Sequence, residues 1–142
     1  YASLVFKKDL VALDSLSALE KSWIAPLPIE FDINLPGYKG MMSMQGGQDG
    51  KKMPKAQAIK DATMAYFINK NRKENSIFVH YNGTYHSDNY EGINWYLRKL
   101  DADIQIVTIA MVEQKDITKL EAEHYNKADF VLVIDEDVTK TH

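Results

Sequence analysis

The sequence contains no cysteine. Disulfide bonds and thiolate metal sites are therefore excluded, whereas the compartment stays open, because a cysteine-free chain suits the cytoplasm and the cell envelope equally. The longest apolar runs fall far short of the ~20 residues that a helix needs to cross a bilayer. The formal net charge of −3, without an obvious basic face, gives no reason to expect a nucleic-acid partner.

What remains is the composition of an ordinary globular domain. The 142 residues are 45% hydrophobic and 26% charged, which supplies one modest core and argues against disorder. The chain begins at Tyr1 rather than at a methionine, so we expect it to be processed or to be a fragment of a longer protein.

The first part of the sequence predicts two helices and a long loop. Apolar residues at roughly helical spacing predict a helix over residues 3–14. A capping box formed by Ser17 and Glu20 predicts a second helix over residues 18–24. Residues 26–52 carry prolines and glycines and predict a loop, and a loop of this length in a small domain often has a function.

The rest of the sequence alternates helices with apolar runs. A long helix is predicted from Pro54, which suits a first helical turn, to about Arg72. Buried strands are predicted at residues 76–81, 104–112 and 130–134. Shorter helices are predicted at residues 93–100 and from residue 116 or 118 to about 125. This order predicts an α/β fold with a parallel sheet flanked by helices, although three strands form a thin sheet.

Tyrosine and histidine are concentrated in residues 80–97, directly after the first predicted strand. Half of the eight tyrosines and half of the four histidines lie there. In open α/β sheets, ligands usually bind beyond the carboxyl ends of the strands. Phenolates are hard donors that suit ferric iron, and imidazole can ligate a metal or hydrogen-bond a phenolate. The candidates are Tyr81, Tyr85, Tyr90, His80 and His86. The alternative is that these side chains cap the core and bond to backbone.

The predicted long helix carries a second set of candidates. Gln57, Asp61 and Met64 lie at i, i+4 and i+7, on one stripe of the helix. An acid and an amide on this stripe would line a polar cleft, or they would belong to a solvated face. Five of the six methionines lie between residues 41 and 64 and predict either a mobile apolar flap over a ligand or core packing.

Acidic residues near the two C-terminal strands predict no metal site. They lack a histidine at metal-site spacing; they are Glu113, Asp116, Asp135 and Asp137. His124 lies beside Glu121 and Glu123 in a charged predicted helix, where we expect it to be solvated.

Three segments carry a family resemblance. They are Lys55-Ala-Gln-Ala-Ile-Lys-Asp-Ala-Thr-Met-Ala65, Gly83-Thr-Tyr-His86 and Gly92-Ile-Asn-Trp-Tyr-Leu97. Together with the opening Tyr-Ala-Ser-Leu-Val and with Ile24-Ala-Pro-Leu-Pro28, they resemble the ChaN-like haem-binding uptake lipoproteins of the Tiki and erythromycin-esterase-like superfamily. The likeness covers most of the chain.

The resemblance implies a cofactor and a site. Haem, an iron porphyrin, is the expected cofactor. By resemblance the cleft residues are Gln57, Asp61, Met64, Gly83 and His86. The expected iron ligands are His86 and Tyr85. Tyr81 and Tyr90 are expected to contribute to the haem site. The choice among the tyrosines rests on the loop alone.

The resemblance also implies a larger assembly. Residues 1–142 would be the C-terminal portion of a single ChaN-like α/β domain, lacking an N-terminal half that holds a lipoprotein signal and the first of two Gly-x-x-His elements. The expected partners are haem, that N-terminal half, a second copy in a homodimer, and the haem and iron uptake machinery of the outer membrane. The expected location is the cell envelope, with a lipid anchor in the bacterial outer membrane.

Two functions are therefore compared. The leading hypothesis is a non-enzymatic haem-binding protein that serves haem or iron uptake. The alternative is a metal-dependent hydrolase, because Tiki relatives are proteases and erythromycin-esterase relatives hydrolyse esters. His86 and Asp61 would then bind a divalent metal or act as general acid and base.

Overall fold

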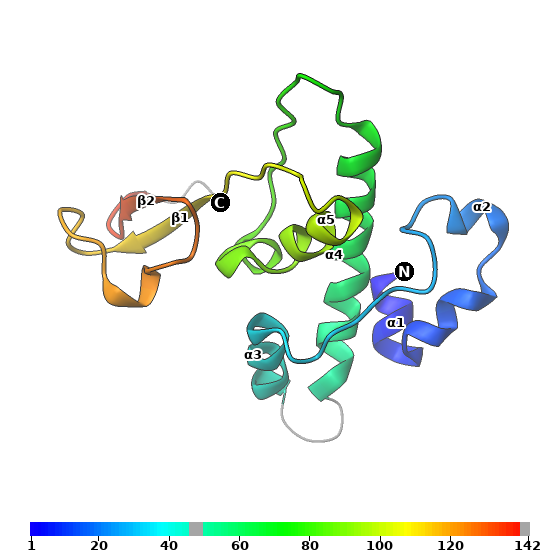
Figure 1. Ribbon diagram of the computed structural model, residues 1–142. Helices are drawn as coiled ribbons and strands as arrows, with labels where there is room; N and C mark the ends of the chain where they lie inside the picture. The colour runs from blue at the N-terminus through cyan, green and yellow to red at the C-terminus, as the bar shows by residue number, and fades with distance from the viewer. Residues whose placement is uncertain (46–49, 140–142) are drawn as a thin grey trace.

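The computed structural model describes residues 1–45 and 50–139. Its centre is the 20-residue helix α4 (Lys52–Asn71), against which α1, α3 and α5 pack (Figure 1). The prediction of a long helix from Pro54 is confirmed. Small residues let its neighbours approach closely: Ala58 and Ala65 are fully buried and Ala62 nearly so.

On one side of α4 lie three short helices, α1 (Ala2–Lys8), the 3-10 helix η1 (Leu10–Ser15) and α2 (Ala18–Lys21). Val5, Leu13 and Ile24 form a small core there with Ile59 of α4. The prediction of one helix over residues 3–14 is wrong at Asp9, whose φ of 71° interrupts the helix. The capping box at the start of α2 is confirmed.

On the other side lie α3 (Pro36–Gln45) and α5 (Ile93–Leu100). The prediction of a loop over residues 26–52 is wrong for α3, because Tyr38 and Met41 bury their side chains in a core with α4 and α5. The prediction of a mobile methionine flap is wrong for Met41, because its side chain belongs to that core. Burial in the core thus overrides the weak helix propensity of the two glycines in α3.

The sheet has two parallel strands, β1 (Ile109–Gln114) and β2 (Phe130–Asp135), in the register Ile109 to Phe130. The predicted α/β class with a parallel sheet is confirmed. The sheet lies beside the helical part of the protein (Figure 1). The helix predicted between the two strands is wrong in the main: only the 3-10 turn η5 (Ala122–His124) forms.

The strand predicted at residues 76–81 is also wrong. No strand is assigned there, and Ile77, Phe78 and Val79 are 92%, 43% and 64% exposed. A β-strand needs a neighbour for its backbone hydrogen bonds, and neither described strand pairs with this segment. The apolar run therefore lies in solvent, ahead of the 3-10 turns η3 (Thr84–His86) and η4 (Asp88–Tyr90).

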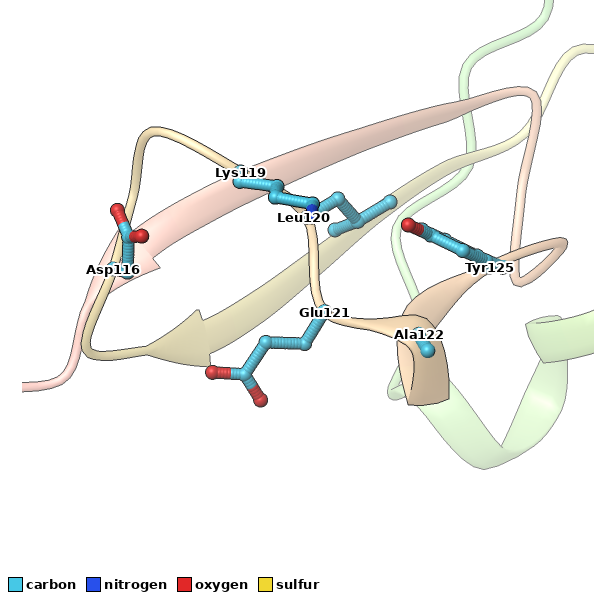
Figure 2. A pocket seen from close by; sticks show the side chains of 6 residues that line it. All are labelled: Asp116, Lys119, Leu120, Glu121, Ala122 and Tyr125. Carbon is cyan, nitrogen blue, oxygen red and sulfur yellow. The ribbon is translucent and has the colours of Figure 1, made fainter.

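The two faces of the sheet differ. Along β1, Ala110, Val112 and Gln114 are buried, whereas the alternate residues are exposed. Gln114 fixes the connection to β2 on the buried side: its Nε2 donates to the Lys119 carbonyl at 2.8 Å, and the Glu121 N–H donates to its Oε1 at 3.2 Å. This connection lines an open pocket of about 330 Å³ (Figure 2). Among the described helices, none has the length and apolar character to span a membrane.

Candidate functional site

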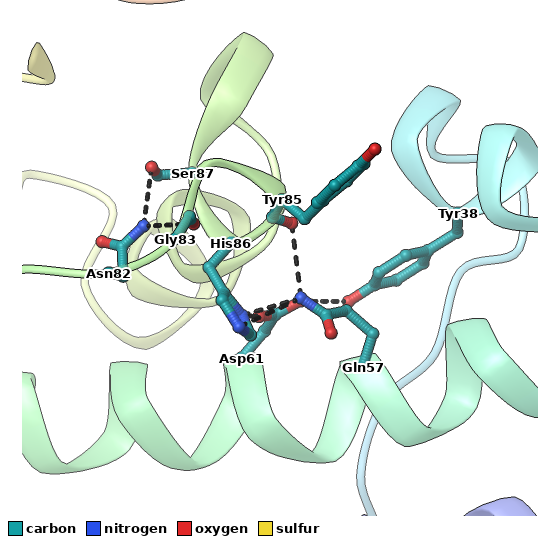
Figure 3. A network of polar contacts seen from close by, with 8 residues as sticks. All are labelled: Tyr38, Gln57, Asp61, Asn82, Gly83, Tyr85, His86 and Ser87. Atoms are coloured by element: carbon teal, nitrogen blue, oxygen red, sulfur yellow. Dashed lines mark hydrogen bonds and ion pairs between the residues drawn. The ribbon is translucent and has the colours of Figure 1, made fainter. Parts of the chain in front are cut away.

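The site is built on a buried carboxylate. Asp61 lies in the middle of α4 and is 0% exposed. His86, at the end of η3, places its Nδ1 2.5 Å from Asp61 Oδ1. On the other side, the Tyr38 hydroxyl of α3 donates a hydrogen bond to Asp61 Oδ2 at 3.0 Å (Figure 3). One acid therefore joins three elements that are distant in sequence.

Burial controls the electrostatics of this cluster. It raises the pKa of Asp61, although His86 and Tyr38 both act to lower it through their hydrogen bonds. Burial likewise raises the pKa of Tyr38, and the nearby charge of Asp61 adds to that effect. Tyr38 therefore stays a neutral phenol that donates its proton, rather than a phenolate that could bind a metal.

The contact with Asp61 fixes the orientation of His86. A ring nitrogen either donates or accepts, and a carboxylate partner favours the tautomer in which Nδ1 carries the proton. The Gln57 amide nitrogen lies 2.7 Å from Nδ1. In this tautomer it cannot donate to Nδ1, which is itself a donor, and its acceptors are His86 Nε2 and the Tyr85 carbonyl, each at 3.4 Å. In this tautomer Nε2 holds the lone pair, and the imidazole is 20% exposed.

A close backbone approach seats the histidine turn on α4. Gly92, just before α5, has φ +54°, and a Cβ there would lie 2.3 Å from the His86 carbonyl oxygen and 3.3 Å from Asp61 Oδ2. The neighbouring Asn94 side chain donates to the Ser87 carbonyl at 3.0 Å. The start of α5 thus holds the turn against the buried acid.

The structure brings together three of the residues singled out from the sequence, Gln57, Asp61 and His86. Met64 is partly buried against the α4 and α5 core. Gly83 precedes η3, and no atom lies within 4 Å of where its Cβ would be. His80 is exposed. The partial desolvation of its ring lowers its pKa, and the proximity of His86 adds to that effect.

The three loop tyrosines do not join this cluster in the structure. Tyr81 is 91% exposed, and Tyr85, 66% exposed, turns its ring away from His86 (Figure 3). The Tyr90 hydroxyl lies 3.4 Å from Asp129 Oδ1. Sequence reasoning missed Tyr38 as a partner of Asp61. The signal available was its helical spacing with Met41 in the segment predicted to be a loop.

A family model described as "Haem-binding uptake, Tiki superfamily, ChaN" matches residues 1–97. No curated protein and no solved structure matches the chain significantly. The matched region contains Gln57, Asp61 and His86, and it ends within α5, before the sheet begins.

Proposed function

This chain belongs to the ChaN family of haem-binding uptake proteins in the Tiki superfamily, and we propose that it binds haem with His86 as the residue nearest the iron. The observation that carries the proposal is the Asp61–His86 pair. Histidines that bind metals usually donate the other ring N–H to a carboxylate, which fixes the ring and raises its basicity. Asp61 is placed to do this at 2.5 Å, leaving Nε2 for iron.

The donor set around His86 fits an iron porphyrin. A bound haem would supply a ferric iron that accepts an imidazole nitrogen or a phenolate oxygen. Tyr85 adjoins His86 and exposes its ring, and Tyr81 and Phe78 offer further exposed rings that could cover a flat macrocycle. For Tyr90, partial burial and then the Asp129 carboxylate raise the pKa, which disfavours its phenolate. Gln57 and Met64 would border the same face of α4.

Ferric haem added to the full chain should shift the Soret band and saturate at one equivalent. His86→Ala should weaken binding at least tenfold, because it removes the imidazole that Asp61 orients toward the iron. Tyr85→Phe should change the spectrum only if the phenolate ligates iron. Tyr125→Phe is the matched control, since Tyr125 is also exposed but lies beside the sheet connection.

The opposite result would favour the alternative function. The Asp61–His86 pair also resembles the general-base half of a hydrolase site. The first such result is that the spectrum of haem stays unchanged when the protein is added. The second is an ester or peptide hydrolysis that is abolished both by chelators and by His86→Ala. Together these two results would replace haem binding by metal-dependent hydrolysis as the proposed function.

We further propose a cell-envelope location, as an uptake role requires, with a lipid anchor carried by an N-terminal half that completes the domain. A homodimer and the outer-membrane uptake machinery are the remaining expected partners. Fractionation of cells that produce the natural full-length protein should place it with the outer membrane. Recovery in the cytosol would contradict this placement.

A further inference from the structure

A second group of ligating side chains lies in the turn between β1 and β2, beyond the region that matches the family. Glu121, Glu123 and His124 each offer a donor atom, and these atoms all lie within 4.8 Å of one another. The turn borders the open pocket, and Glu121 is one of the residues that line it (Figure 2). Acidic side chains often lie close together on a surface without binding an ion. Whether this group binds one therefore depends on the histidine.

His124 is buried, and its ring lacks hydrogen-bond partners in the part of the chain that the structure describes. The sequence predicted a solvated side chain, and this is wrong: the residue is 8% exposed. Within residues 1–45 and 50–139, neither ring nitrogen makes a hydrogen bond. Nε2 faces Glu123 Oε1 at 3.6 Å, which is too long for a hydrogen bond. A buried nitrogen without a partner costs free energy, and such groups in folded proteins call for an explanation.

The backbone of the turn is held in place before any ligand arrives. The His124 N–H donates to the Glu121 carbonyl at 3.0 Å, closing η5. The Glu121 N–H in turn donates to Gln114 at the end of β1. The backbone of Glu121 and of His124 is therefore already fixed by hydrogen bonds that lead to the sheet. Binding an ion would cost little conformational entropy of the backbone there.

We propose that Glu121, Glu123 and His124 bind a divalent transition-metal ion of the zinc class. An imidazole nitrogen with carboxylate oxygens is a zinc-type donor set, whereas Mg²⁺ and Ca²⁺ prefer oxygen alone. Nε2, which faces Glu123, is the ligating nitrogen. Three protein ligands leave a fourth coordination position for water or for a small anion. The two carboxylates neutralise the charge of the ion.

Zinc titrated into the full chain without haem should bind at one equivalent with a micromolar or lower dissociation constant. Glu121→Gln and Glu123→Gln should each weaken binding at least tenfold, and both together at least a hundredfold. Both side chains are exposed, so these variants should keep the fold. Glu74→Gln, at an exposed acid outside the turn, is the matched control and should bind zinc unchanged.

Cobalt in place of zinc reports on the donors directly. X-ray absorption of the cobalt form should show one imidazole with oxygen ligands, and His86→Ala should leave that spectrum unchanged. Equal zinc affinity of the wild-type chain and the Glu121→Gln, Glu123→Gln double variant would overturn the proposal. Loss of the cobalt spectrum in His86→Ala would overturn it too, by assigning the ion to the other site.

Discussion

Asp61→Ala should lower the free energy of unfolding by about 3–5 kcal/mol, the cost expected when one partner of a buried polar pair is removed. The reason lies in what it leaves behind. The Tyr38 hydroxyl and His86 Nδ1 both lose their carboxylate partner. Alanine also leaves a cavity at a position that is 0% exposed. Urea unfolding followed by circular dichroism measures the change.

The matched control is Glu30→Ala. The Glu30 carboxylate also forms an ion pair, with Lys99 at 2.6 Å, but its side chain is 61% exposed. Removing an exposed pair should cost about 1 kcal/mol or less. Equal losses in the two variants would mean that the Asp61 network contributes nothing beyond a surface pair.

Asp61→Asn separates folding from ligand binding. The amide keeps the volume and can still accept from one neighbour, and burial raises the pKa of Asp61, so losing the charge relieves a desolvation cost. Stability should therefore fall much less than in Asp61→Ala. Haem affinity should nevertheless fall about 10–100-fold, because a neutral amide no longer fixes the His86 tautomer.

The elements predicted correctly are those whose determinants are local. Pro54 at the first turn and the alanines that follow predict α4, and Ser17 with Glu20 predicts the start of α2. The apolar run of β2 was likewise predicted within a residue of its observed end. In these cases propensity, capping and burial all favour the same structure.

The failures share the opposite property. The run Ile77–Val79 has the residues of a strand, but strand formation depends on a neighbour that sequence spacing does not report. The α3 helix was missed because two glycines disfavour it locally, and the burial of Tyr38 and Met41 against α4 decides the outcome. His124 is expected in solvent from the charges beside it, yet it is 8% exposed, and the Glu121 N–H at the start of its turn donates to Gln114 on the buried side of β1.

The candidate site was predictable in part. Helical spacing puts Gln57 and Asp61 on one stripe, and the family motif singles out His86. Their contact joins residues 25 positions apart, so no local pattern predicts that Asp61 and His86 meet at 2.5 Å. The role of the exposed tyrosines as cleft residues stays a prediction for the haem titration to test.

Gly92→Ala should lower the free energy of unfolding by at least about 3 kcal/mol and weaken haem binding with it. With φ +54° and ψ −119°, Gly92 has a backbone conformation that L-residues avoid, which costs about 1–3 kcal/mol. The new Cβ would also lie 2.3 Å from the His86 carbonyl oxygen, a backbone atom. Relief of that clash requires the turn carrying His86 to move off α4 and away from Asp61.

Gly83→Ala distinguishes this steric argument from a general need for glycine. Gly83 has φ −71° and ψ 152°, which any residue adopts, and its added Cβ would meet no atom within 4 Å. Its stability should change by about 1 kcal/mol or less, with alanine favoured because it restricts the unfolded chain. If both variants unfold at the same urea concentration, then contact between the start of α5 and the His86 turn does not hold the site together. If Gly83→Ala keeps its stability but loses haem affinity, the glycine of the family motif is required for close approach of the ligand, whereas Gly92 is required by the protein's own packing.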